Sequence, residues 1–263
     1  MTFQKVQTLE KLDKIDSNNR DLELFPLVMT VGSRNSGKMM DQDFINTLLL
    51  TGKLAGWTTA ILFAIGFPMA YLLAYKRFWV KPIVEALISM PLVLPPTVLG
   101  FYMLVAYSPQ NAFGRFLAEH FNTRLAFSFE GVLIASVIFS LPFMIQPLQN
   151  GLTSIPKSYR ETAYTLGKSE FTTVIRVLVP NMIPSIITAA AMTFAHCIGE
   201  FGVVIMVGGN MPGETRVASI AIYDEVQAMN YQTANQYSFI LFIVSLVILT
   251  LVYSINKRNP INI

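Results

Sequence analysis

The sequence predicts an all-α integral membrane protein with five transmembrane helices. Of its 263 residues, 53% are hydrophobic and only 13% are charged, about half the charged fraction of a typical soluble domain. Five long blocks contain no Asp, Glu, Lys or Arg: residues 54–75, 86–114, 131–156, 177–199 and 226–256. Each block exceeds the roughly 20 residues that a helix needs to cross the hydrocarbon core of a lipid bilayer. Five such runs exclude a soluble helical domain.

From these blocks we expect transmembrane helices near residues 48–75, 86–107, 131–150, 181–207 and 237–255. Residues 44–258 therefore form the transmembrane domain. Residues 1–43 form an N-terminal extension of unknown role, and we expect no signal peptide because no apolar run there precedes a small-residue cleavage site.

The extension contains a glycine pattern that imitates a phosphate-binding loop, Gly32-Ser-Arg-Asn-Ser-Gly37-Lys38. Met39 stands where that motif needs a Ser or Thr hydroxyl for magnesium. The first span also begins too soon for a nucleotide-binding unit to follow. We therefore predict no nucleotide site here, and ATP hydrolysis is expected in a separate subunit.

Prolines interrupt the second predicted span at Pro91, Pro95 and Pro96. Proline removes a backbone donor, and broken backbone at membrane depth is tolerated where it lines a cavity or packs on protein. Discontinuous helices of this kind often border transport pathways. Thr97 adds a hydroxyl donor at the same place. The alternative is a purely structural kink.

A short soluble-looking helix is predicted between the third and fourth spans. Ser158 and Glu161 have the spacing of a capping box, and Gly167 stands where a helix C-terminus needs positive φ. A charged helix follows and is expected to stop at Pro180. A helix this short is not stable alone, so we expect it to dock into a groove of a soluble partner.

The contact face of that helix is predicted from helical spacing, which places Tyr159, Ala163 and Leu166 on one side together with Ile155. Ala163 lies in the middle of this face, where a larger side chain would hold two surfaces apart.

These residues carry a resemblance to a known family. The stretch resembles the EAA loop of ABC importer permeases, with matches at Glu161, Ala163, Gly167 and Pro180 and mild departures at Thr162, Val177 and Val179. Two further stretches, residues 91–100 and residues 199–202 with 209–216, look like the molybdate permease branch of that family. The resemblance runs from about residue 44 to the end of the chain.

The resemblance implies a type I ABC importer permease that moves an oxyanion, molybdate above all, as a homodimer. It further implies two cytoplasmic ATPase subunits and an extracytoplasmic oxyanion-binding protein. Coupling to the ATPase would fall to Glu161, Ala163 and Gly167, with Tyr159 and Leu166. Tungstate or sulfate remain as alternative substrates, and a standalone channel or membrane enzyme is the rival class. Nothing points to nucleic acid.

In the fourth span, His196 and Glu200 share a helix face. They indicate either half of a metal site or, as we favour, a hydrogen-bonded pair. Gly199 and Gly202 permit a break in the helix beside Glu200. We therefore expect a translocation gate where this region meets Pro95, Pro96 and Thr97. The row of Ala191, Ala195 and Gly199 allows close helix approach, either within the chain or at a dimer interface.

The sequence gives no support for enzymatic catalysis. One cysteine and two histidines make a Cys/His catalytic pair improbable, and no nucleophile elbow or zinc motif occurs. We predict no catalytic residue, no metal and no cofactor.

Loop charges predict the orientation. Nine Lys or Arg residues lie in the loops and C-terminal tail on one side of the membrane, and three lie in the loops on the other side. This count places the C-terminus and the loop containing Glu161 in the cytoplasm and the N-terminus outside. The six Lys or Arg residues of the N-terminal extension count against this tally.

Overall fold

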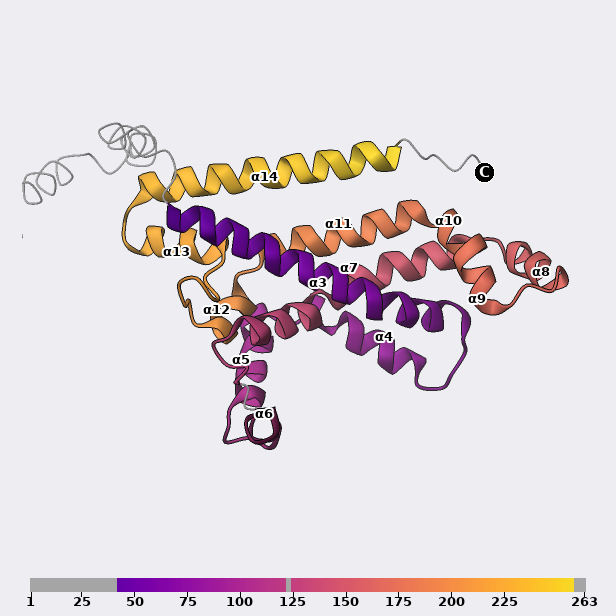
Figure 1. The fold of residues 1–263 in the computed structure, drawn as a ribbon, viewed down its shortest axis with the longest axis horizontal. Helices are drawn as coiled ribbons and strands as arrows, with labels where there is room; N and C mark the ends of the chain where they lie inside the picture. The colour runs from indigo at the N-terminus through magenta and orange to yellow at the C-terminus, as the bar shows by residue number, and fades with distance from the viewer. Residues whose placement is uncertain (1–41, 122–123, 258–263) are drawn as a thin grey trace, which may run out of the picture.

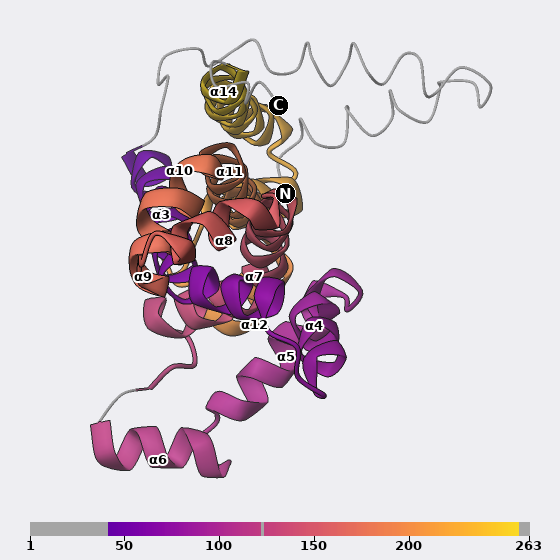
Figure 2. The ribbon, with the colours of Figure 1, turned by 90° about the vertical axis from the view of Figure 1, so that its right-hand side faces the viewer.

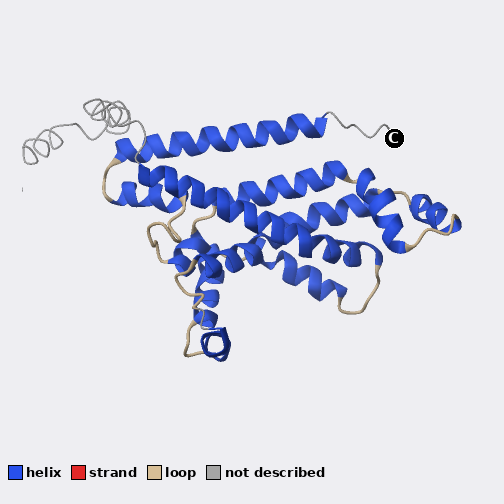
Figure 3. Cartoon of the chain, viewed as in Figure 1, coloured by secondary structure: helices blue, strands red, loops and turns tan. Residues whose placement is uncertain are grey.

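The structure, a computed structural model, describes residues 42–121 and 124–257. Within these ranges the chain forms helices and no β-strand, which confirms the all-helical class (Figure 3). The first described helix begins at Gln42, two residues before the predicted domain boundary. The rest of the N-terminal extension, including its glycine pattern, lies outside the described residues.

Three helices form the centre of the bundle: α3 (Gln42–Tyr75), α7 (Phe129–Ser154) and α11 (Ile183–Gly199). Each of them packs against the other two. Close approach depends on small residues: a Cβ at Gly151 of α7 would lie 2.5 Å from the Ser185 Cβ of α11. Buried Leu, Ile and Met side chains such as Leu62, Met144 and Leu148 fill the space between the helices.

The remaining elements follow the chain around this centre (Figure 1). They are α4 (Lys81–Ser89), η1 (Met90–Leu92), α5 (Pro96–Tyr107), α6 (Ala112–Phe121), α8 (Lys157–Thr165), α9 (Glu170–Thr173), the π-helical η2 (Val174–Leu178), α10 (Val179–Asn181), α12 (Gly202–Gly208), α13 (Ala218–Gln227) and α14 (Tyr231–Lys257). Figure 2 shows α5 and α6 extending away from the bundle.

Three helices are long and apolar enough to cross a membrane: Gln42–Tyr75, Phe129–Ser154 and Tyr231–Thr250. Two bent pairs pass the same test together, so the described residues hold up to five spans. Most of α14 faces outward, with Phe239 and Phe242 more than 60% exposed, as expected of a surface that contacts lipid.

Two of the predicted spans are broken in the structure, as the prolines of the second span and the glycines beside Glu200 predict. The segment 86–107 is divided among α4, η1 and α5, and Lys81–Leu92 and Pro96–Tyr107 meet at an angle of 109°. The break itself has a local cause: Pro95 has extended backbone (φ −55°, ψ 135°) directly before Pro96, and a residue before proline is disfavoured in the α conformation. The segment 181–207 is broken at Met182 and again at Glu200–Phe201.

The charged helix before the fourth span also continues past Pro180. It ends at Asn181, after which the chain bends by 76° into α11. Pro180 lies in the last turn of the continuous helical segment that runs from α9 through η2 to α10, where a proline soon ends a helix. The prediction that Pro180 ends the helix is therefore wrong by one residue, and the true break is at Met182.

Candidate functional site

The helix α8 stands with α9 at one end of the bundle (Figure 1). It begins after Pro156, which has extended backbone (φ −56°, ψ 139°) and provides no side-chain cap. Ser158 is consequently the second residue of the helix, not its cap, so the predicted capping box is wrong. Proline before the helix already supplies the restricted backbone angle that a cap residue would otherwise have to adopt.

The C-terminus of α8 agrees with the prediction. Gly167 has φ +70°, and its N–H donates to the Tyr164 carbonyl at 2.9 Å. The Lys168 N–H donates to the Ala163 carbonyl at 3.0 Å. This is the Schellman arrangement, in which a left-handed residue lets the chain turn away sharply from the helix.

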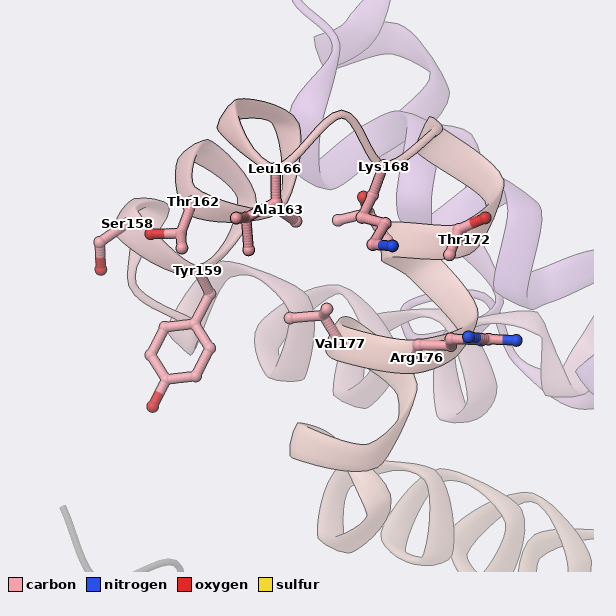
Figure 4. A pocket seen from close by; sticks show the side chains of 10 residues that line it. Ser158, Tyr159, Thr162, Ala163, Leu166, Lys168, Thr172, Arg176 and Val177 are labelled. Carbon is pink, nitrogen blue, oxygen red and sulfur yellow. The ribbon is translucent and has the colours of Figure 1, made fainter.

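An apolar groove of about 460 Å³ separates α8 from α9 and η2 (Figure 4). Its walls carry the predicted contact face and residues of the following helices: Ser158, Tyr159, Thr162, Ala163, Leu166, Lys168, Thr172, Thr173, Arg176 and Val177. Ala163 is only 5% exposed and lies deep in the groove, whereas Tyr159 and Leu166 are 47% and 69% exposed. A small residue at this depth keeps the groove open between two exposed apolar side chains.

Glu161 lies on the opposite face of α8, where it lines a separate polar pocket. It therefore does not join Tyr159, Ala163 and Leu166 in the groove. The structure brings the last three together and places Gly167 at the end of the same helix.

Long-range contacts that no sequence pattern predicted tie this end of the molecule to α3. The Tyr71 hydroxyl donates to the Glu170 carboxylate at 2.7 Å, and the Tyr75 hydroxyl donates to the Leu152 carbonyl at 2.7 Å. The Arg160 guanidinium lies over the Tyr75 ring, 3.9 Å from its centroid. Through these contacts α8 and α9 are both attached to the end of α3.

Burial alone lowers the pKa of Arg160, but a hydrogen bond to Tyr164 and the neighbouring phenol groups shift that pKa upward overall. Arg160 therefore remains a cation in this setting.

The structure brings some of the predicted gate residues into contact and leaves others apart. Pro96 and Thr97 begin α5 and touch Gly202 at the start of α12: a Cβ on Gly202 would lie 2.6 Å from the Pro96 Cβ and 3.4 Å from the Thr97 nitrogen. Gly100 continues this contact one turn later, since its Cβ would lie 2.8 Å from the Met206 Cβ. Pro95 precedes α5 as its cap residue. A Cβ on Gly199, by contrast, would meet no atom within 4 Å.

Glu200 sits in the helix break itself and is 6% exposed. Its Oε1 accepts the Val203 N–H at 2.9 Å, and its carbonyl accepts the Ser219 hydroxyl at 2.6 Å. The carboxylate thus caps the N-terminus of α12 while the backbone holds α13.

His196 Nδ1 is 3.9 Å from Glu200 Oε2, too far for a hydrogen bond, and the imidazole packs against Phe139 and Phe143. Across the described ranges, no third His, Cys, Asp or Glu joins the pair.

Comparison with known proteins now identifies the class of this chain. Residues 37–259 match the family described as the inner membrane component of binding-protein-dependent transport systems. The chain belongs to this family. It is a multi-pass inner membrane protein and a permease subunit of an ABC importer, a transport component and not an enzyme.

Two individual relatives support the family assignment. The chain is 43% identical over 205 residues to the molybdenum transport system permease protein ModB of Azotobacter vinelandii, covering 78% of this chain and 91% of the relative. It is 30% identical over 215 residues to a probable sulfate transport system permease protein cysT of Chlorella vulgaris, covering 82% and 80%.

Solved structures show the same fold at low identity. The inward-facing MetNI methionine ABC transporter matches with a TM-score of 0.65 and 19% identity, covering 83% of this chain and 99% of that one. A bacterial alginate ABC transporter in complex with an alginate pentasaccharide-bound periplasmic protein matches with a TM-score of 0.69 and 18% identity, covering 83% and 80%.

Proposed function

We propose that this chain forms the translocation pathway of an ATP-driven molybdate importer. The observation that carries the proposal is the 43% identity to a molybdenum transport permease over 91% of that protein. Sulfate is the second candidate, because several sulfate transport permeases are 30–33% identical. The two substrates are both tetrahedral dianions, so the same pathway chemistry serves either.

The coupling element in this proposal is α8 with its groove. An ATPase subunit would insert an apolar element between the exposed Tyr159 and Leu166, above the buried Ala163. The Gly167 turn fixes the exit of the chain toward α9. Because Tyr71 and Tyr75 attach α8 and α9 to α3, a displacement of the groove would be passed directly to a membrane-spanning helix.

The pathway itself is proposed to form between two copies of the chain. A cavity of about 620 Å³ lies between α7, α11 and the end of η1, and its lining is mainly apolar with four polar side chains. Its polar lining consists of Gln146, Asn150, Ser185 and Thr188, and none of the described residues lining it is basic. Neutral hydrogen-bond donors can pass a dianion without holding it tightly, which suits a conduit whose selectivity resides in an external binding protein.

The gate is proposed at the contact between α5 and α12, where Pro96 and Thr97 meet Gly202 and Glu200 caps the broken helix. Pro95 provides the extended hinge before α5. Gly199 ends α11 without a close neighbour in the described chain, so it contributes freedom at the break and no packing.

We further propose that α8 faces the cytoplasm, as does the C-terminus, with the N-terminus on the outer side. This orientation follows from the Lys and Arg count of the loops. It places α8 on the side where ATP is available to two ATPase subunits, and the opposite end on the side of the binding protein.

Uptake measurements test the substrate. The permease would be reconstituted in liposomes with its ATPase and its external binding protein, and uptake of radiolabelled molybdate would be compared with that of radiolabelled sulfate. We expect ATP-dependent molybdate uptake that a large excess of sulfate does not abolish. Preferential sulfate uptake would assign the second candidate, and uptake without ATP would contradict the importer.

A further inference from the structure

A second hollow lies on the face of α8 opposite the apolar groove. Its volume is about 540 Å³, and it is bounded by the end of α3, the start of α4, the end of α7 and α8 itself. Five basic residues line it, Lys76, Arg77, Lys81, Lys157 and Arg160, against one acidic residue, Glu161. We refer to it as the cationic pocket.

The positive charge of the cationic pocket is largely uncompensated. Lys81 pairs with Glu85, the Nζ to Oε1 distance being 3.8 Å. Among the described residues, the other four basic side chains make no ion pair. Two helices, α4 and α8, also begin at residues that line the pocket, Lys81 and Lys157, and a helix N-terminus adds partial positive charge.

One of these cations is held in place by the wall of the pocket. Arg160 stacks on the Tyr75 ring at 3.9 Å, and its buried Nε has no hydrogen-bond partner within the described part of the chain. A guanidinium fixed in this way is suited to bind a phosphate group, for which its planar donors match the geometry.

The surroundings of the cationic pocket indicate where such a phosphate would come from. The loop directly after Arg77 presents Phe78, Trp79 and Val80, with Trp79 94% exposed. Next to them, α4 exposes Ile83 (60%) and Leu87 (56%). A fully exposed tryptophan beside basic residues at the end of a membrane span is typical of the membrane–water interface.

We propose that the cationic pocket binds the phosphate headgroup of an anionic phospholipid, whose acyl chains lie along the exposed apolar side of α4. Basic pockets between helices at the membrane surface bind such headgroups. The bound lipid would neutralise the pocket and brace α8 against α3 and α4. This site does not depend on which oxyanion is transported.

Fluorescence quenching in the full-length permease tests the proposal. The chain has two tryptophans, so Trp57→Phe leaves Trp79, at the rim of the site, as the reporter. The protein would be titrated in detergent micelles with brominated phosphatidylglycerol or brominated phosphatidylcholine, which carry the same quencher on an anionic or a zwitterionic lipid. We expect phosphatidylglycerol to quench at a much lower mole fraction.

The Arg77→Gln/Lys157→Gln double variant should raise the half-quenching mole fraction of phosphatidylglycerol roughly 30-fold, since each basic residue near an anionic headgroup contributes about fivefold. Its matched control is Lys168→Gln/Arg176→Gln, which also removes one lysine and one arginine charge, but from the apolar groove. Lys168 lies in the loop after α8 and Arg176 in η2, across the apolar groove from α8, so the control should change by less than about threefold because of ionic screening.

Three outcomes would overturn the proposal. Equal quenching by both lipids would leave an acidic protein partner as the occupant. Equal losses in the two double variants would reduce the effect to general surface charge. Displacement of phosphatidylglycerol by sulfate or molybdate, but not by chloride at the same ionic strength, would assign the pocket to a free oxyanion.

Discussion

Gly202 sits at the tightest contact of the proposed gate, which makes Gly202→Ala a direct perturbation of it. The new Cβ would lie 2.6 Å from the Pro96 Cβ, whereas carbon atoms pack at about 3.5–4.0 Å. Because a proline ring cannot rotate away, α5 and α12 must separate by roughly 1 Å. Overpacking of this kind costs about 1–3 kcal/mol, and the helical preference of Ala over Gly offsets roughly 0.5–1 kcal/mol of that.

Thermal unfolding in detergent and molybdate uptake in liposomes measure the two consequences. Gly202→Ala should lower the unfolding temperature and slow uptake, while ATPase association stays intact because α8 lies at the other end of the bundle (Figure 1). Gly56→Ala in α3 is the matched control, since an added Cβ there meets nothing within 4 Å. Wild-type stability and uptake in Gly202→Ala, or an equal loss in the control, would refute the assignment of the gate to this contact.

Orientation, coupling and capping each give one further prediction. In intact cells a cysteine placed at Ser158 should resist a membrane-impermeant thiol reagent and one placed at the exposed Gln110 should react; the reverse pattern would invert the orientation. Tyr71→Phe removes the 2.7 Å hydrogen bond to Glu170, so it should cost at most about 1 kcal/mol of stability yet lower the molybdate transported per ATP hydrolysed; unchanged stoichiometry would show that this bond is only structural. Glu200→Gln keeps an oxygen that accepts the Val203 N–H and should cost about 1 kcal/mol or less, whereas Glu200→Lys buries an unpaired cation at roughly 3–5 kcal/mol; equal unfolding temperatures for the two variants would contradict the capping role.

Features encoded by neighbouring residues were predictable from the sequence. The long apolar runs appear as α3, α7 and α14 because hydrophobic length alone determines whether a helix can span. The left-handed turn at Gly167 was also predictable, because it depends only on the residue type at the end of a helix.

Features that depend on competing local signals, or on residues far apart in the sequence, could not be predicted from the sequence. The Ser158–Glu161 spacing predicts a capping box, but Pro156 starts the helix two residues earlier. The Tyr71–Glu170 hydrogen bond joins residues 99 positions apart, a separation that no local pattern reveals. Similarly, the prolines of the second span predict a break, whereas its 109° angle depends on how α5 packs against α12.

The central claim is that α8 forms the contact with the ATPase, and copurification tests it most directly. Gly167 and Gly213 have nearly the same backbone, with φ of +70° and +78°, and a Cβ added to either would meet no atom within 4 Å, so a valine strains each by a similar ~1–2 kcal/mol. Gly213 lies in the loop between α12 and α13, far from α8 (Figure 1). We predict that ATPase recovered with the tagged permease falls sharply for Gly167→Val and stays at the wild-type level for Gly213→Val. Full recovery of the ATPase with both variants would contradict the claim.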